Sequence, residues 1–267
     1  MTYFGFLVRF LVVPILALLL ALMWDRQRGL GLPSSLRNLP AWAVVALHVL
    51  VALLYTTPWD NYLVATRVWW YDPNLVTGIT LGWVPIEEYT FFVLQTLLTG
   101  LWLLWLAPRL ARAPGWAPDG RIQRLAVLIA GLLWLPTPFL LAVRVVPATY
   151  LALILVWALP PVALQLAFGA DILWRYRRLV TAAVLVPTVY LWLADTLAIR
   201  LGIWTISPRQ TLELCLPGGL PLEEATFFLM TNVLIGFGIT LALAEESKMR
   251  LRIFQRVLGM QTDSAEP

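Results

Sequence analysis

The sequence predicts an all-α integral membrane protein with seven transmembrane helices, arranged as two parallel three-helix repeats joined by one linking helix. Two observations predict this fold class. The chain has 267 residues, of which 60% are hydrophobic and only 13% are charged, outside the usual range of soluble globular domains. In addition, a motif with two adjacent glutamates occurs twice, 136 residues apart, and opens a long apolar run each time.

The apolar runs are long enough to cross a bilayer, because about 20 helical residues span roughly 30 Å of hydrocarbon. Seven spans are expected, at 4–23, 40–57, 86–107, 125–143, 146–168, 180–199 and 221–244. The first run lacks a basic leader and a small-residue cleavage site, so we expect it to be retained as a membrane helix. Prolines inside the runs predict kinks, above all at Pro160-Pro161.

The basic residues predict the orientation in the membrane. The connectors after spans one, three, five and seven carry 14 of the 19 basic residues. By the positive-inside rule, we expect a multi-pass protein of the cell membrane with its amino terminus outside and its carboxyl terminus in the cytoplasm. Because these residues act as topology signals, the net charge of +4 does not indicate a nucleic-acid partner.

The internal repeat is wider than the glutamate motif. The matched pairs outside the motif are Asp60 with Asp195, Arg67 with Arg200, Trp70 with Trp204 and Pro73 with Pro208. Span four matches neither copy, and this extra crossing lets the second triplet enter the membrane in the same direction as the first. We therefore expect a first repeat over 1–107, a linker with the fourth helix over 108–145, a second repeat over 146–244 and a disordered cytoplasmic tail over 245–267.

The repeated motif is the strongest candidate for a functional site. Its copies read Pro85-x-Glu87-Glu88-x-x-Phe91-Phe92 and Pro221-x-Glu223-Glu224-x-x-Phe227-Phe228. Proline and acidic residues also favour a helix N-terminus for structural reasons alone. However, carboxylates at the edge of an apolar span are costly and are by default candidates for function. Each glutamate also has a phenylalanine one turn deeper on its own face. The polar face continues with Gln95, Thr96, Thr99, Thr231 and Asn232.

Acid pairs in apolar surroundings predict proton transfer. Burial and like charge both disfavour full ionisation, so we expect at least one carboxyl to be neutral near pH 7 and to serve as a proton donor. The aromatic rings would stabilise a carbocation by cation–π attraction. Such chemistry needs no cofactor, and the sequence has no dinucleotide fingerprint, phosphate loop or His-Glu-x-x-His motif. Its single cysteine, Cys215, excludes a cysteine metal cage.

The sequence gives weaker evidence of a functional role for the remaining polar residues of the spans and their connectors. His48 is expected to be a packed, hydrogen-bonded core histidine, since no second metal ligand has helical spacing with it. Asp60 with Arg67, and Asp195 with Arg200, are expected to form ion pairs that fix the outer loops, with a helper role in catalysis as the alternative. Most of the 14 tryptophans are expected to be interfacial anchors.

At these residues the chain resembles the membrane-integral lycopene cyclases of carotenoid synthesis, a family found as two small subunits, as one fused chain, or as a domain of a bifunctional synthase. Besides both glutamate motifs, the resemblance is carried by Thr57-Pro58-Trp59-Asp60-Asn61-Tyr62, Trp69-Trp70-Tyr71 and Gly202-Ile203-Trp204-Thr205-Ile206. It covers both halves of the chain. From this resemblance we expect the chain to be the fused form, with no attached synthase domain.

The resemblance implies cyclisation of the linear ends of lycopene to β-ionone rings, giving β-carotene through γ-carotene without net redox change. It carries the catalytic role over to Glu87, Glu88, Glu223 and Glu224. The groups expected to shield the cation are Phe91, Phe92, Phe227, Phe228, Trp70 and Trp204, and the supporting residues are Asp60, Arg67, Asp195, Arg200 and Asn232. The polyene is expected between the two repeats, roughly along the membrane normal. The resemblance implies lycopene and the lipid bilayer as partners, and it is compatible with association with other carotenoid-pathway enzymes.

Other functions stay open at the level of the sequence. A related cyclase would make other rings or act on longer carotenoids. A transporter would share the layout of two three-helix repeats around one helix, and a passive carotenoid-binding protein would need only an apolar groove. A retinal protein is excluded, because the only lysine, Lys248, lies beyond the last span.

Overall fold

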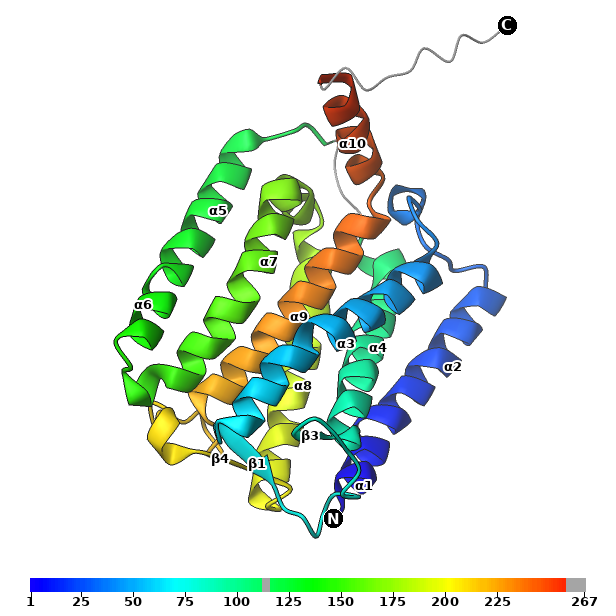
Figure 1. Cartoon of the computed structure of the whole chain (residues 1–267). Coiled ribbons are helices and arrows are strands. Elements are labelled where there is room, and N and C mark those ends of the chain that lie inside the picture. Colours follow the sequence, from blue (N-terminus) through cyan, green and yellow to red (C-terminus); the bar gives the residue numbers. More distant parts are fainter. Residues whose placement is uncertain (112–115, 258–267) are drawn as a thin grey trace, which may run out of the picture.

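The computed structural model describes residues 1–111 and 116–257. Over these ranges it is mainly helical, with seven helices long and apolar enough to cross a membrane (Figure 1). They are Tyr3–Gln27, Ser34–Ala65, Ile86–Leu110, Gly120–Ala142, Val146–Arg175, Arg177–Arg200 and Leu222–Leu243. The seven predicted spans are therefore confirmed in number and place. The second span ends eight residues later than the predicted residue 57, at Ala65, which matters for the site below.

The spans are built from helices that follow one another closely along the chain. The first consists of α1 (Tyr3–Leu7), a π-helical turn (Val8–Val12) and α2 (Val13–Gln27). The later helices are α3 (Ala41–Ala65), α4 (Ile86–Leu110), α5 (Gly120–Trp134), α6 (Pro136–Ala142), α7 (Thr149–Arg175), α8 (Arg177–Arg200), α9 (Leu222–Leu243) and α10 (Glu245–Val257). Short 3₁₀ turns lie at Ser34–Leu36, Val146–Ala148 and Pro208–Gln210.

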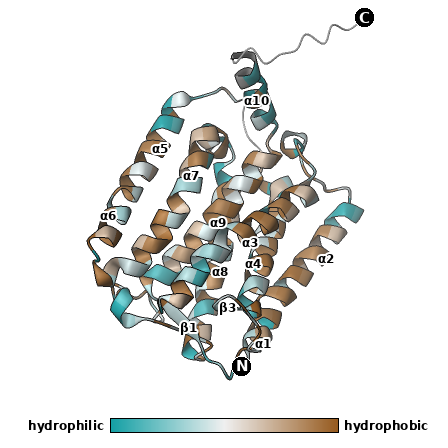
Figure 2. Cartoon of the chain, viewed as in Figure 1, coloured by the Kyte–Doolittle hydropathy of each residue, from teal (hydrophilic) through white to brown (hydrophobic). Residues whose placement is uncertain are grey.

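Helices α4 and α9, which carry the glutamate motifs, lie at the centre of the bundle. In their most apolar stretches 56% and 50% of the residues are buried, against 11% in the α5–α6 span. Helix α9 packs against α7, α8, α3 and α4, whereas α5 and α6 cover α7 on one side and α2 covers α4 on the other (Figure 1). Apolar residues run along the spans, and polar residues gather at α10 and at the helix ends (Figure 2).

Helix α7 has a kink at a glycine near its C-terminal end. The backbone leaves helical geometry at Gly169 (φ −157°, ψ 34°), whereas the kink was predicted at Pro160-Pro161. Gly169 lies against Leu241 of α9 so closely that an added Cβ would come within 2.4 Å of its Cδ2 atom. A larger residue at this position would therefore have to displace the Leu241 side chain, which lies where α7 approaches α9.

Two small antiparallel strand pairs, which the sequence did not predict, organise the connectors at the end of the bundle where α4 and α9 begin. Strand β1 (Trp69–Tyr71) pairs with β4 (Trp204–Ile206), with Trp69 opposite Ile206 and Tyr71 opposite Trp204. Strands β2 (Thr80–Leu81) and β3 (Val84–Pro85) form a hairpin that leads into α4. The β1–β4 pair thus joins the connector before α4 to the connector before α9.

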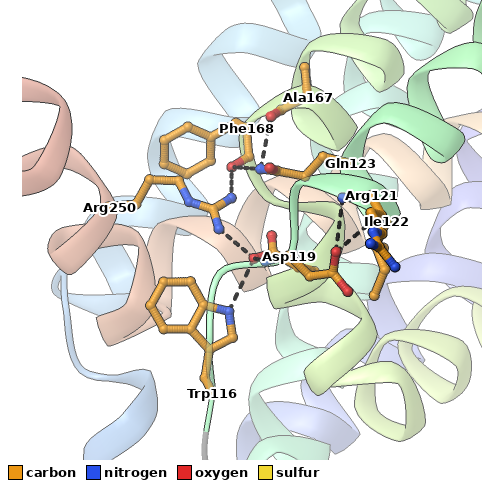
Figure 3. A network of polar contacts seen from close by, with 9 residues as sticks. Trp116, Asp119, Arg121, Ile122, Gln123, Ala167, Phe168 and Arg250 are labelled. Carbon is orange, nitrogen blue, oxygen red and sulfur yellow. Dashed lines mark hydrogen bonds and ion pairs between the residues drawn. The ribbon is translucent and has the colours of Figure 1, made fainter. Parts of the chain in front are cut away.

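The predicted disordered tail is wrong over residues 245–257, which form α10. Its Arg250 is buried, forms an ion pair with Asp171 and donates to the Phe168 carbonyl at the bend of α7 (Figure 3). Asp171 also accepts from the Trp116 indole N–H and the Asp119 backbone N–H, which ties the start of α5 to the same point. These polar contacts hold a helix that its polar sequence alone does not predict. The rest of the predicted tail, 258–267, lies outside the described residues.

Candidate active site

Both glutamate pairs lie in the first turn of a central helix. Pro85 and Pro221 are the N-cap residues of α4 and α9, with extended backbone geometry that ends the preceding connector. All four glutamates that follow are buried, with relative exposures between 0% and 8%. The free N–H groups and dipole of a helix N-terminus favour carboxylates there. The sequence therefore buries these glutamates at a helix N-terminus, which stabilises part of their negative charge.

One glutamate of each pair reaches a shared pocket, which we call the acid chamber. Glu88 of α4 and Glu224 of α9 line it, together with Asp60 of α3 and Asp195 of α8. Its other lining residues are Tyr3, Trp59, Trp69, Tyr71, Phe91, Phe92, Tyr150, Trp204, Ile206, Phe227 and Phe228. The free volume is about 30 Å³, room for about one water molecule. Four carboxyl groups therefore meet in a small chamber lined by aromatic residues.

Tyrosines and a tryptophan hold three of the four carboxyls. The Tyr3 hydroxyl donates to Glu88 Oε2 over 2.5 Å, and the Tyr150 hydroxyl donates to Glu224 Oε1 over 2.6 Å. Tyr71 adds a second donor to Glu88 Oε2, at 3.0 Å. These hydrogen bonds fix the direction of both glutamates toward the chamber.

The two aspartates of the chamber differ in their hydrogen bonds. Asp195 Oδ1 accepts from the Trp204 indole N–H over 2.9 Å. In contrast, neither carboxyl oxygen of Asp60 has a hydrogen-bond partner within residues 1–111 and 116–257. The matched positions of the two halves therefore carry the same side chain in different surroundings.

The chamber has carboxyls but no basic residue in its described lining. These carboxyls affect the pKa of Tyr71, which lies on a connector strand outside the spans. Burial, with Glu88 and Asp60 close by, raises the pKa of the Tyr71 hydroxyl well above its ordinary value, so the hydroxyl keeps its proton and donates. Because four adjacent buried carboxylates without a counter-ion would repel one another, the chamber is suited to holding protons.

The other glutamate of each pair contacts a connector. Glu87 Oε1 accepts from the Thr77 backbone N–H over 2.6 Å, and Glu223 Oε1 accepts from the Leu212 backbone N–H over 2.7 Å. Neither glutamate lines the acid chamber. Of the four predicted catalytic glutamates, the structure therefore brings Glu88 and Glu224 together and directs Glu87 and Glu223 to the loops.

The ion pairs predicted for the two aspartates are wrong. Arg67 and Arg200 are exposed, and Arg200 donates to the Gly218 carbonyl. Helix α3 continues to Ala65 and carries Asp60 into the bundle, where it is 1% exposed. The ion pairs of the described chain lie elsewhere: Arg109 with Asp25, Arg175 with Glu246 and Arg250 with Asp171. Asp60 and Asp195 thus belong to the acid chamber, and the two arginines do not.

The structure places five of the six aromatic residues that were predicted to shield the cation at the chamber wall. Trp204 and the four phenylalanines of the motif line the chamber, as predicted. Trp70 does not, because neighbouring residues of a strand face opposite sides, and its side chain is 36% exposed while Trp69 faces inward. Trp69 is the tryptophan of β1 that lines the chamber.

The polar track of α4 and α9 joins the two helices below the chamber. Gln95 Nε2 donates to Thr231 Oγ1 over 2.7 Å, and Thr99 Oγ1 donates to Asn232 Oδ1 over 2.6 Å. Asn232 in turn donates to Thr188 of α8. The predicted support residue Asn232 therefore fixes three central helices and lies away from the chamber.

A second, larger hollow lies beside the chamber, and we call it the lateral cavity. Its volume is about 350 Å³, and Phe92 and Phe227 line it as well as the chamber. The remaining lining comes from α3, α4, α7 and α9: Leu47, His48, Val51, Ala52, Tyr55, Thr56, Gln95, Thr96, Trp157, Pro161, Gln165, Thr231, Leu234 and Ile235. Its rim is open to the outside of the bundle, because Leu47, Val51 and Tyr55 are each more than 40% exposed.

His48 lies in the lateral cavity wall, with Nδ1 hydrogen-bonded to the Val44 carbonyl, as expected of a packed histidine. A further cavity of about 340 Å³ lies between α2, α4 and α8, lined among others by Pro14, Ala17 and Tyr190. It shares no lining residue with the acid chamber. The lateral cavity is therefore the one of the two that adjoins the carboxyl groups.

Sequence reasoning missed the tyrosines of the chamber. Tyr3, Tyr71 and Tyr150 carried no spacing signal that sets them apart from other aromatic residues near span ends. The available signal was that a tyrosine stands at the start of both span one and span five. In the structure these two residues make the same contact with Glu88 and Glu224.

Comparisons with known proteins identify the family of this chain. A family model described as lycopene cyclase matches residues 2–106 and 147–242. A protein of Halobacterium salinarum named lycopene beta-cyclase is 41% identical over 242 residues, 90% of this chain and 95% of that protein. A protein of Podospora anserina named bifunctional lycopene cyclase/phytoene synthase is 40% identical over 200 residues, 72% of this chain and 33% of its own length. No solved structure matches. This chain belongs to the lycopene cyclase family.

Proposed function

We propose that this chain is a lycopene β-cyclase, which converts the linear ends of lycopene to β-ionone rings by acid and base catalysis. The observation that carries the proposal is the acid chamber, where four carboxyls from four helices meet among aromatic rings. Family membership supplies the substrate class. Ring closure rearranges bonds within one molecule, so it needs a proton donor and a proton acceptor and no net transfer of electrons.

The reaction has three steps at each end of the polyene. A carboxylic acid of the chamber protonates the terminal double bond, which forms a C–H bond and leaves a tertiary carbocation. The electrons of a second double bond then close a six-membered ring and move the cation into that ring. Finally a carboxylate removes a ring proton and restores an alkene. One proton enters and one leaves, so atoms and charge balance.

The aromatic lining suits the cationic intermediates. Trp59 stacks on Trp157 with 4.6 Å between ring centroids and on Phe227 with 5.7 Å, and Phe91 meets Phe228 edge to face at 6.1 Å. Ring faces attract a cation and expose no nucleophile to it. A chamber with room for about one water also limits capture of the cation by solvent.

The lateral cavity is the proposed site for the polyene next to its reacting end. Along α3 it runs from Leu47 to Thr56, which is about 14 Å at 1.5 Å per residue. It follows the helix direction, which supports a polyene roughly along the membrane normal. Its volume lies near the small end of ligand pockets, roughly 300–1,000 Å³. It suits one end of a long polyene at a time, with the remainder in the bilayer.

The arrangement as two parallel three-helix repeats is part of the proposal. The contacts Tyr3–Glu88 and Tyr150–Glu224 support it, as does the antiparallel pairing of β1 with β4. Residues 1–107 and 146–244 would be the repeats, with 108–145 as the linker. We place the amino terminus outside and the carboxyl terminus in the cytoplasm, because α1 and the basic α10 lie at opposite ends of the bundle (Figure 1).

Association with other carotenoid-pathway enzymes is also proposed. The fungal relatives support it, because their names join lycopene cyclase and phytoene synthase in one chain. A stable contact would place the cyclase next to an earlier enzyme of the same synthesis. Co-purification of this chain with a tagged phytoene synthase from native membranes would test the contact.

Expression in cells that accumulate lycopene tests the proposed function. The wild-type chain is expected to convert lycopene to β-carotene, with γ-carotene as the intermediate. Glu88→Gln and Glu224→Gln, which keep the size of the side chain, are each expected to lower ring formation about a hundredfold or more. Full β-carotene formation by the double variant would overturn the assignment, and rings of another kind in the wild type would assign a different cyclase product.

A further inference from the structure

We infer that the first half of the chain supplies both proton-transfer groups of the acid chamber: Asp60 is the proton donor to the polyene, and Glu88 is the base that removes the ring proton. The inference rests on the proposed function and deepens it. It starts from a difference between positions that the sequence repeat makes equivalent.

Asp60 is the chamber carboxyl with the least support for a negative charge. It is 1% exposed, it lies on the inward face of α3, and both of its oxygens lack a hydrogen-bond donor among the residues the structure describes. An ionised carboxylate without donors or a counter-ion is strongly disfavoured in an apolar site. Asp60 therefore holds a proton, and its O–H group has no protein acceptor to compete with an alkene in the chamber.

Asp195, the counterpart of Asp60, is held differently. It accepts the indole N–H of Trp204, the inward-facing tryptophan of β4. Trp69, the inward-facing tryptophan of β1, donates instead to the Tyr71 hydroxyl over 3.0 Å. One local sequence difference accounts for this, because β1 ends in Tyr71 where β4 ends in Ile206. Tyr71 takes up the tryptophan N–H in the first half and leaves Asp60 without a donor.

The same tyrosine makes Glu88 the better carboxylate. Glu88 Oε2 accepts from both Tyr3 and Tyr71, whereas Glu224 accepts from Tyr150 alone. Hydrogen bonds donated to a carboxylate favour its charged form. The donation from Trp69 to Tyr71 polarises the Tyr71 hydroxyl further toward Glu88. The negative charge of the chamber therefore resides on Glu88.

The proton balance of this scheme closes within the chamber. The O–H bond of Asp60 breaks as the first C–H bond of the product forms, and the ring C–H bond breaks as Glu88 gains an O–H bond. After one ring closure Asp60 is ionised and Glu88 is protonated. Both groups line the same space, with room for about one water. This water takes the proton from Glu88, exchanges with solvent between ring closures and supplies a solvent-derived proton to Asp60.

The type of ring formed distinguishes the two roles. A defect in the donor slows protonation but leaves the later loss of the ring proton unchanged. A defect in the base lets the ring cation lose a proton from a neighbouring carbon, which gives ring isomers with a shifted double bond. Product analysis therefore reports on the base alone, and the rate of lycopene consumption reports on both.

We would compare Asp60→Asn, Glu88→Gln and Tyr71→Phe with Asp195→Asn, the matched variant of the second half. Asp60→Asn is expected to lower the rate about a hundredfold or more with β-rings as the only product. Glu88→Gln is expected to lower the rate and add shifted isomers, and Tyr71→Phe to add them to a smaller extent. Asp195→Asn is expected to retain at least about tenfold more activity than Asp60→Asn.

Folding is checked by the thermal melting and lycopene co-purification of each variant, so that loss of structure is separated from loss of proton transfer. The inference is overturned if Asp195→Asn is as inactive as Asp60→Asn, if Asp60→Asn shifts the ring type, or if Glu88→Gln leaves it unchanged. Failure of the wild-type chain to cyclise lycopene would instead overturn the proposed function itself.

Discussion

The two glutamates of each motif have separate tasks because adjacent residues of a helix point about 100° apart. Glu88 and Glu224 face the acid chamber, and Glu87 and Glu223 face the connector before their helix. The doubled motif predicted buried acids with neighbouring phenylalanines, but identical spacing could not show which acid faces inward. That choice depends on the connector, whose backbone N–H groups take up one glutamate of each pair.

Glu87 is expected to act as a positioning residue. Glu87→Ala leaves the Thr77 N–H without its acceptor and is expected to lower the free energy of unfolding by about 1–3 kcal/mol. Glu87→Gln retains an acceptor oxygen and is expected to keep cyclisation within about tenfold of the wild type. Thermal melting in detergent and β-carotene yield measure the two effects. Glu87→Gln as inactive as Glu88→Gln would contradict this role.

At the scale of elements, the helices were predictable and their contacts were not. Hydrophobic runs set the seven spans, because length and apolarity alone decide whether a helix crosses a membrane. The end of α3, the strand pair β1–β4 and helix α10 escaped prediction, since each depends on contacts far along the chain. Asp60 is an example. It was expected in a loop, paired with an arginine, but the helix ends eight residues later than predicted, and Asp60 therefore lies in the acid chamber.

The lateral cavity leads to a prediction about α3. Ala52→Phe would fill it and is expected to abolish lycopene binding, measured as lycopene that co-purifies with the inactive Glu88→Gln/Glu224→Gln protein. Ala17→Phe places the same side chain in the other cavity, of about 340 Å³, and is expected to leave the bound lycopene unchanged. Lycopene loss with Ala17→Phe but not with Ala52→Phe would show that the polyene occupies the other cavity.

A buried ion pair between Arg250 and Asp171 holds helix α10 against α7, and loss of either charge is expected to release the helix. Asp171→Asn leaves Arg250 buried without its charge partner, and breaking a buried pair typically costs about 3–5 kcal/mol. The expected result is faster protease cleavage within α10. The double variant Asp171→Leu/Arg250→Met removes both charges and is expected to recover part of the protection. Equal cleavage of wild type and Asp171→Asn would show that the pair does not hold α10.

In the whole molecule, the two copies of the glutamate motif contribute to one chamber, and the hydrogen bonds to its carboxyl groups differ between the two copies. The predicted repeat placed two acid motifs at the same end of the bundle, and the structure brings Glu88 and Glu224 into one pocket. The unequal hydrogen bonding was beyond prediction, because it arises where β1 and β4 meet and Tyr71 faces the chamber without a tyrosine counterpart.

The orientation of the molecule can be tested with its natural cysteine. Cys215 is exposed in the connector between β4 and α9, at the end of the bundle that we place outside the cell. A membrane-impermeant maleimide is expected to label it in intact cells. In Cys215→Ser/Met249→Cys, the new thiol on the exposed face of α10 is expected to react only after permeabilisation. The reverse labelling pattern would invert the proposed topology.

The central claim is that the buried carboxyls pass a solvent-derived proton to a hydrocarbon and take another back. The most direct measurement is the mass of β-carotene made by the purified protein in lycopene-loaded liposomes in heavy water, without added nucleotide or metal. The account predicts one non-exchangeable deuterium in each new ring and none in the remaining lycopene. Rings formed without deuterium, or no ring formation by the intact protein under these conditions, would contradict it.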